Sequence, residues 1–221
     1  QRLLAVGKAS RVLILVPESL VHQWFVELLR RFNLWFSIFD EERCRSVEHG
    51  DPGANPFLDE QLALCSVSFL TENEVRRQQA IEGEWDMVVV DEAHHLEWSP
   101  DEVSDDYTLA EELAIRSEGL LLLTATPTQL GLEGHFARLR LLDHDRYDDF
   151  QSFMEEAEDF GTVAEIAGKI IDDESLDAKD KEQLIRIFDK DPEGLEEHLT
   201  SLASKLPGAK ENLLNSLLDQ H

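Results

Sequence analysis

Five short hydrophobic runs, each bounded by polar or turn-forming residues, punctuate the first part of the chain. Most are rich in Val, Ile and Leu and show no alternation with polar residues, which is typical of strands buried on both faces of a parallel sheet. The predicted strands are residues 12–16, 36–39, 62–67, 87–90 and 120–123. Helical segments lie between them, so the pattern predicts an α/β fold with right-handed crossovers.

Residues 19–32 show the clearest helical periodicity between these strands. Val21, Trp24, Phe25 and Leu28 stand at i, i+3, i+4 and i+7 and form one apolar stripe. Ser19 is the expected N-cap of this helix. Further helices are predicted up to Gly7, at 72–81 and at 107–115.

From residue 132 onward the pattern is helical to the end of the chain. Helices are predicted at 163–171, 179–188, 192–206 and 211–218, with breaks at Gly161, 172–175, 191–192 and 207–208. The spacing of the leucines is most simply that of a small helical core. We therefore expect an α/β part at residues 1–145 and a small all-helical subdomain at 146–221.

The composition is that of a globular protein, with 42% hydrophobic and 30% charged residues among 221. No apolar run has the length of a membrane span, so no membrane partner is expected. Cys44 and Cys65 have no further Cys or His at metal-ligand spacing, which argues against zinc and favours a reducing, cytoplasmic compartment.

The formal net charge is −27, from 47 acidic and 20 basic residues. Both parts are acidic, with 29 acidic and 13 basic residues up to 150, and 18 and 7 after it. This charge argues against wrapping of nucleic acid by the chain alone, because phosphate binding needs Lys and Arg. An acidic surface usually serves solubility, and docking of a basic partner is the alternative.

Candidate chemistry begins where the strand at 87–90 ends, in Asp91 and Glu92. Ligands of open α/β sheets bind at the carboxyl ends of the strands. One acid there can hold a hydrated Mg²⁺ while its neighbour orients a water. Two solvated acids at a strand end are the plain alternative. His94 and His95 are too close in sequence to supply two well-directed ligands, so metal-only phosphohydrolase chemistry is disfavoured.

Gly7 and Lys8 do not form a phosphate loop. Arg2 stands where the loop needs its first glycine, and Ala9 stands where it needs Ser or Thr. The pair also precedes a strand instead of following one. No phosphate loop is found elsewhere in the sequence.

Four stretches together carry a resemblance to the first motor lobe of helicase superfamily two. They are Val16-Pro17-Glu18-Ser19-Leu20 with Gln23-Trp24, Ser66-Val67-Ser68-Phe69, Asp91-Glu92-Ala93-His94, and Thr124-Ala125-Thr126-Pro127. They resemble motif Ia, the next nucleic-acid-facing motif, the DEAH-type motif II and motif III. The Gln-Trp pair in the first stretch resembles the Swi/Snf-type branch.

Longer stretches resemble a bacterial, RNA polymerase-associated group of ATPases within that branch. They are residues 28–34, 39–43, 121–131 and 135–143. The similarity covers residues 1 to about 155 closely and the helical segment more loosely. Ala125 departs from the glycine usual in the eukaryotic branch and agrees with the bacterial form.

The resemblance implies a RecA-like sheet in a bacterial, cytoplasmic, nucleoid-associated protein. It implies that the intact protein hydrolyses ATP with Mg²⁺, moves on DNA or RNA, and binds RNA polymerase core or holoenzyme to promote its recycling. Asp91 would hold magnesium through water and Glu92 would polarise the attacking water. His94, Thr124 and Thr126 would couple the nucleotide state to the grip on nucleic acid. Nucleic-acid binding would involve Pro17, Ser19, Ser66 and Ser68.

The chain departs from this family in lacking the phosphate loop, expected before motif Ia, and the arginine-finger motifs, expected in a second lobe. We therefore expect residues 1–145 to be a partial RecA-like lobe with motifs Ia to III, residues 146–221 to be an acidic helical insertion, and the fragment to be inactive as an ATPase. An interaction module that docks RNA polymerase is one alternative. Another superfamily-two member, such as a restriction translocase or repair helicase, is a second, which the Gln23-Trp24 pair disfavours.

Overall fold

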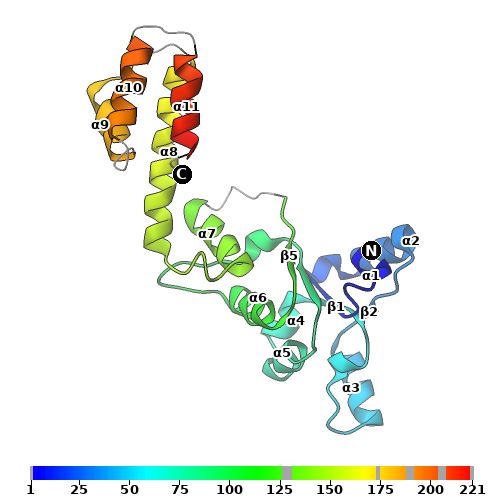
Figure 1. The fold of residues 1–221 in the computed structure, drawn as a ribbon. Coiled ribbons are helices and arrows are strands. Elements are labelled where there is room, and N and C mark those ends of the chain that lie inside the picture. The colour runs from blue at the N-terminus through cyan, green and yellow to red at the C-terminus, as the bar shows by residue number, and fades with distance from the viewer. Residues whose placement is uncertain (1, 126–130, 173–174, 188–191, 204–207, 220–221) are drawn as a thin grey trace. The chain divides into compact units, whose positions relative to one another are not determined.

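The computed structural model describes residues 2–125, 131–172, 175–187, 192–203 and 208–219. The chain divides into two compact units, Gln1–Phe150 and Gln151–His221. In Figure 1 the first runs from blue to green and the second from yellow to red.

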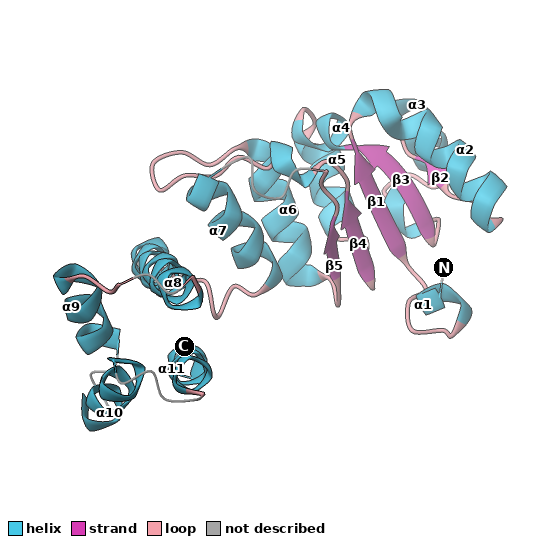
Figure 2. Ribbon diagram, turned by 90° about the horizontal axis from the view of Figure 1, so that it is seen from above, coloured by secondary structure: helices cyan, strands magenta, loops and turns pink. Residues whose placement is uncertain are grey.

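The first unit contains a five-stranded sheet in the order β2-β3-β1-β4-β5, with every neighbouring pair parallel. Figure 2 shows the strands side by side with helices on both faces. This confirms the predicted parallel α/β sheet. The strands are β1 (Val12–Val16), β2 (Ser37–Ile38), β3 (Leu62–Ser66), β4 (Met87–Val90) and β5 (Leu120–Leu122).

The helices of this unit precede the sheet, join successive strands or follow the last one. They are α1 (Arg2–Ala5), α2 (Val21–Phe32), α3 (Glu41–Gly50), α4 (Val67–Thr71), α5 (Glu74–Ile81), α6 (Asp105–Arg116) and α7 (Gly131–Leu142). Three single turns of 3-10 helix accompany them: η1 (Glu18–Leu20), η2 (Pro56–Leu58) and η3 (Ala93–His95).

Each face of the sheet has its own hydrophobic core. On one face Val12, Ile14 and Val89 pack with Val21 and Leu28 of α2. On the other face the alternate strand residues pack with side chains from α4, α5, α6 and α7, including Leu70, Ala80, Leu113 and Ala137. All five residues of β1 are therefore buried, which explains why its sequence shows no polar alternation.

Two local predictions are wrong, and one helix was missed. Ser19 does not cap α2; it lies inside η1, and the N-cap position of α2 is Leu20, which makes no side-chain capping bond. Helix α3 was not expected at all, because its sequence has little apolar periodicity. Gly161 does not break the chain's helical path, since α8 (Phe150–Ile171) continues through it.

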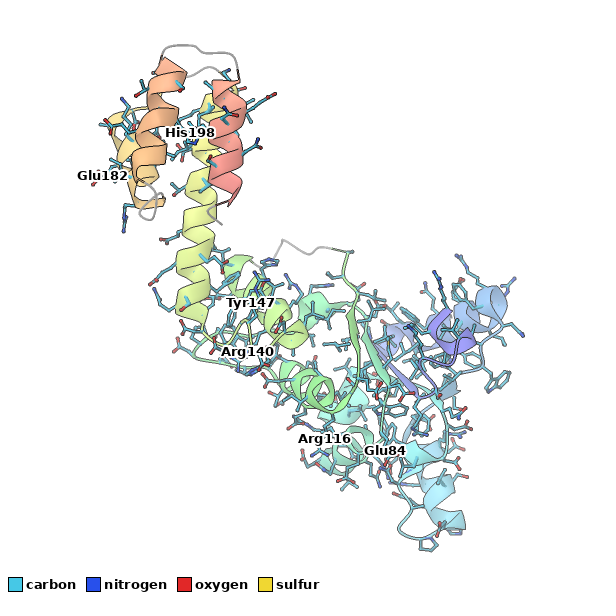
Figure 3. All side chains as sticks on the ribbon, in the orientation of Figure 1. Glu84, Arg116, Arg140, Tyr147, Glu182 and His198 are labelled. Atoms are coloured by element: carbon cyan, nitrogen blue, oxygen red, sulfur yellow. The ribbon has the colours of Figure 1, made fainter. Side chains whose placement is uncertain are left out.

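The second unit is helical, as predicted. After α8 come α9 (Ala178–Ile187), α10 (Pro192–Ala203) and α11 (Ala209–Asp219). Val163, Ile166, Leu184, Leu195 and Leu213 belong to one hydrophobic core, drawn from all four helices. Polar contacts also join the helices: Lys169 Nζ lies 2.6 Å from Asp180 Oδ1, and His198, labelled in Figure 3, lies 2.9 Å from the Ser216 hydroxyl. This unit therefore has a core of its own.

Candidate functional site

The parallel register places the ends of the predicted motif strands at one edge of the sheet. Leu15 lies opposite both Cys65 of β3 and Val90 of β4, and Val90 lies opposite Leu122 of β5. The segments that follow β1, β3, β4 and β5 therefore all leave the sheet at its carboxyl edge, where ligands of open α/β sheets bind. Pro17 and Asp91 follow two of these strands directly.

Asp91 continues the path of β4 for one residue and is fixed by three hydrogen bonds. Its backbone N–H donates to the carbonyl of Leu15 over 2.9 Å. Its Oδ1 accepts the backbone N–H of Glu92 at 2.9 Å, and its Oδ2 accepts the indole Nε1–H of Trp24 at 2.7 Å. The carboxylate is half-buried, and both of its oxygens are oriented by protein donors.

Glu92 has a left-handed backbone, with φ of 53° and ψ of 42°. For a residue with a side chain this conformation costs roughly 1–2 kcal/mol, so the surrounding contacts must hold it. The next residue provides one such contact, because the N–H of Ala93 donates to the carbonyl of Leu123 over 2.8 Å. The chain therefore leaves the path of β4 at Glu92, directly after Asp91.

His94 lies next to the Glu92 side chain. Its Nδ1 is 3.0 Å from Glu92 Oε2, which is an ion-pair distance without hydrogen-bond geometry. The rings of His94 and His95 lie 4.1 Å apart between centroids and are tilted by 40°. The side chains of His94 and Glu92 are 28% and 31% exposed, so both remain accessible to water.

The other predicted residues of the site differ in how exposed they are. Thr124 is half-buried just beyond β5, and Thr126 lies outside the described residues. Ser19 is exposed in η1. Ser66 is buried; its hydroxyl caps α4 by accepting the N–H of Phe69 at 3.2 Å, and the hydroxyl of Ser68 donates to it at 3.2 Å.

Asp86 and Asp106 of this unit have perturbed pKa values for different reasons. Asp86, at the opposite end of β4, accepts the backbone N–H groups of Arg11 and Ser10, which hold the pKa of its carboxyl below the usual range. Asp106 at the start of α6 has a raised pKa, mainly because burial disfavours its charged form. Asp86 therefore joins two segments at the amino edge of the sheet, away from the motif residues.

The indole of Trp24 was missed as part of the site. Its place in the apolar stripe of α2 assigned it to the core, and its ring does pack with the core on that face. The nitrogen at the edge of the ring nevertheless reaches Asp91, 67 residues away in sequence. The Gln-Trp pair had marked the stretch, but no local pattern indicated that contact.

Comparison with known proteins places the chain in a family. Residues 4–197 match the model of the SNF2-related domain. The chain belongs to this family. The match covers most of both units and confirms the resemblance to the Swi/Snf-type branch.

Curated relatives of this SNF2-related domain include proteins named RNA polymerase-associated protein RapA. The chain is 49% identical over 218 residues to that of Vibrio parahaemolyticus, covering 97% of this chain and 22% of the relative. It is 46% identical over 227 residues to that of Photobacterium profundum, covering 100% of this chain and 23% of the relative. The chain thus spans less than a quarter of their length, and the predicted resemblance to the bacterial group is confirmed.

A solved structure supports the fold. The Sulfolobus solfataricus SWI2/SNF2 ATPase core in complex with dsDNA matches with a TM-score of 0.54 and 20% identity, covering 70% of this chain and 29% of that chain. At this identity the likeness shows the fold alone. Separately, none of the helices among the described residues is both long enough and apolar enough to span a membrane.

Proposed function

We propose that this SNF2-related domain is part of the first motor lobe of an ATP-dependent nucleic-acid translocase. The observation that carries the proposal is the Asp91-Glu92 pair, held at the carboxyl edge of a buried parallel sheet where β1, β3 and β5 also end. In this proposal residues 1–145 are a partial RecA-like lobe with motifs Ia to III, and residues 146–221 are an acidic helical insertion.

Asp91 is the residue that we assign to Mg²⁺, through water. No cluster of three His, Cys, Asp or Glu side chains that could ligate a metal directly is present among the described residues. Mg²⁺ keeps several of its waters and needs few protein carboxylates, so a half-buried carboxylate with fixed oxygens fits it. Bound with ATP, the ion would neutralise charge that develops on the phosphates.

Glu92 is assigned to the attacking water, which its carboxylate would orient and polarise. Phosphoryl transfer asks the protein for little beyond such positioning and charge stabilisation. Its neighbour His94 stands 3.0 Å away and, with Thr124 and Thr126, is assigned to coupling between nucleotide state and nucleic-acid grip. Contacts that change when lobes close are the physical means of such coupling.

We assign contact with a nucleic-acid strand to the segment after β1 and to the junction of β3 with α4. Pro17 and Ser19 lie in the first, whereas Ser66 ends β3 and Ser68 lies in α4. The Ser66 hydroxyl caps α4, so its role is to shape the start of that helix. Ser19 is exposed and is therefore better placed than Ser66 to donate a hydrogen bond to a phosphate. Contacts of this kind position a strand without reading its sequence.

The proposed reaction needs parts beyond this chain, because its sequence contains no phosphate loop. The edge of the sheet supports the same conclusion: among the described residues β5 pairs with β4 alone, and Leu121 is 45% exposed. Apolar edge strands are normally covered. We propose that the longer protein supplies this cover together with the phosphate loop, and that the chain alone is inactive.

The experiment compares ATP hydrolysis, with and without DNA, by this chain and by the longer protein. We expect Mg²⁺-dependent activity in the longer protein only, lost in Glu92→Gln. Glu97→Gln is the matched control, because Glu97 is exposed and lies five residues further along the same segment. Turnover by the chain alone, or full activity of Glu92→Gln, would contradict the assignment.

We also propose that the longer protein binds RNA polymerase and promotes its recycling, as the names of the relatives suggest. Within this chain the helical unit is the candidate docking surface, because it has its own core and carries 18 acidic against 7 basic residues. Binding of purified polymerase core to the chain should weaken with added salt. Binding that is lost only when the α/β unit is altered would exclude the helical unit as the dock.

A further inference from the structure

The Trp24 indole makes a contact that the assigned roles do not explain. Its Nε1–H donates to Oδ2 of Asp91 over 2.7 Å, while the backbone N–H of Glu92 donates to Oδ1 over 2.9 Å. The first contact joins α2 to the end of β4, and the second comes from the residue after Asp91. The carboxylate is thus held at both oxygens by donors from different parts of the chain.

An indole is well suited to fixing a carboxylate. It is a donor only, it keeps its proton at every pH where the protein folds, and it is carried on a rigid ring system. A hydrogen bond to a charged acceptor is also stronger than one between neutral groups. Each oxygen of Asp91 accepts one protein donor, so each keeps acceptor capacity for a metal-bound water.

We propose that Trp24 is a positioning residue for Asp91: its indole N–H fixes the plane of the carboxylate so that the remaining lone pairs face the waters of the bound Mg²⁺. This inference rests on the proposed function, which assigns Mg²⁺ to Asp91. Partners of a metal-binding carboxylate are known to orient it and to tune metal affinity. Trp24 would thereby tie the start of α2, which follows the turn after β1, to the metal-binding acid.

A purely structural role is the competing explanation, because the ring of Trp24 also packs with the hydrophobic core on its face of the sheet. Trp24→Phe separates the two, since it keeps an aromatic ring and removes the donor. Trp35→Phe is the matched control. Trp35 follows the same helix, is 66% exposed, and packs edge-on against Phe25 with 5.5 Å between ring centroids.

The first measurement tests the contact itself in the 221-residue chain. Its four tryptophans give four indole N–H resonances in a ¹H–¹⁵N spectrum, and Trp24→Phe identifies that of Trp24 by its loss. We expect Asp91→Ala to move this resonance upfield and to leave that of Trp35 in place. Where Trp24→Phe fails to fold, the resonance of Trp24 is identified by elimination, from the losses in Trp35→Phe, Trp85→Phe and Trp98→Phe. A Trp24 resonance that does not move overturns the inference.

The second measurement is the Mg²⁺ dependence of ATP hydrolysis by the longer protein. We expect Trp24→Phe to raise the half-saturating Mg²⁺ concentration on the order of 10-fold, with most of the rate restored at saturation. Trp35→Phe should leave it unchanged. An active wild type whose Mg²⁺ dependence is the same in Trp24→Phe overturns the role of Trp24 alone, whereas a wild type that hydrolyses no ATP overturns the proposed function and this inference with it.

Discussion

Arg76 of α5 is a nearly buried cation between two glutamates of α3. Its side chain is 6% exposed, while those of Glu41 and Glu48 are 37% and 30% exposed. Arg76 Nε and Nη2 donate to the two oxygens of Glu41 at 3.0 and 3.1 Å, and Nη2 also donates to Glu48 Oε2 at 3.0 Å. Nη1 contacts Glu48 Oε1 and donates to Gln79 Oε1 at 2.8 Å. This network ties α3 to α5.

Replacing Arg76 by Met keeps much of the packing of the side chain and removes its charge. Breaking a buried ion pair costs about 3–5 kcal/mol, because an uncompensated charge remains, whereas exposed pairs contribute about 0–1 kcal/mol. Here the two carboxylates left behind are about one-third exposed and regain water. We therefore expect the free energy of unfolding to fall by about 2 kcal/mol, between these limits.

Urea unfolding followed by tryptophan fluorescence measures this change. All four tryptophans lie in the first unit, so the signal reports that unit. Arg45→Met is the control, because Arg45 also contacts Glu41, at 2.8 Å, but its side chain is 76% exposed. That variant should lose less than about 0.5 kcal/mol. Equal stability of the two variants would refute the reasoning from burial.

The pH dependence of the same difference gives a second check. Hydrogen bonds from Arg76 lower the pKa of Glu48 to about 2 and also lower the pKa of Glu41, both from 4.5. The unfolded chain therefore takes up protons first as pH falls. The stabilising effect of Arg76 should be complete above about pH 5 and fade as pH falls toward 2. A difference between wild type and Arg76→Met that is unchanged at pH 3 would contradict this account.

Two further substitutions test the backbone and the core. Glu92→Gly should raise the free energy of unfolding of the first unit, measured in urea, by roughly 0.5–1 kcal/mol, because relief of the left-handed conformation at φ 53° outweighs the entropy cost of glycine. A loss of stability would contradict the inference that this backbone is strained. Gly83→Ala should cost about 1–3 kcal/mol, because its Cβ would lie 2.6 Å from the buried Trp85 indole, while Gly50→Ala, which meets nothing within 4 Å, should be near neutral. Similar stability of these two glycine variants would show that the indole can move aside.

The sheet was predictable because its central strands are buried on both faces. The runs at β1 and β4 carry no polar residue, which is typical of strands that helices cover on both sides. The position of Asp91 followed from the same pattern, since a strand end is visible where an apolar run meets two acids. The carboxyl ends then share one edge because the strands are parallel.

The failures have separate physical causes. Helix α3 was missed because it buries Cys44 alone among its residues and so has no apolar stripe. The sequence signal that could have revealed it is at its N-terminus, where Asp40 accepts the N–H of Arg43 at 2.8 Å and two acids occupy the first turn. Gly161 was expected to end a helix, but the about 1 kcal/mol cost of an interior glycine is small beside the burial of Val163 and Ile166 further along α8.

The contact between Trp24 and Asp91 follows from strand order, which sequence patterns do not reveal. β1 and β4 are neighbours in the sheet although two strands, β2 and β3, and the helices from α2 to α5 separate them in the chain. Neighbouring strands lie about 4.8 Å apart, so the first turn of α2, just beyond β1, starts close to the end of β4. A side chain at that turn can serve the core with its ring and the site with its edge. The apolar stripe of α2 and the acid after β4 are therefore parts of one structural unit.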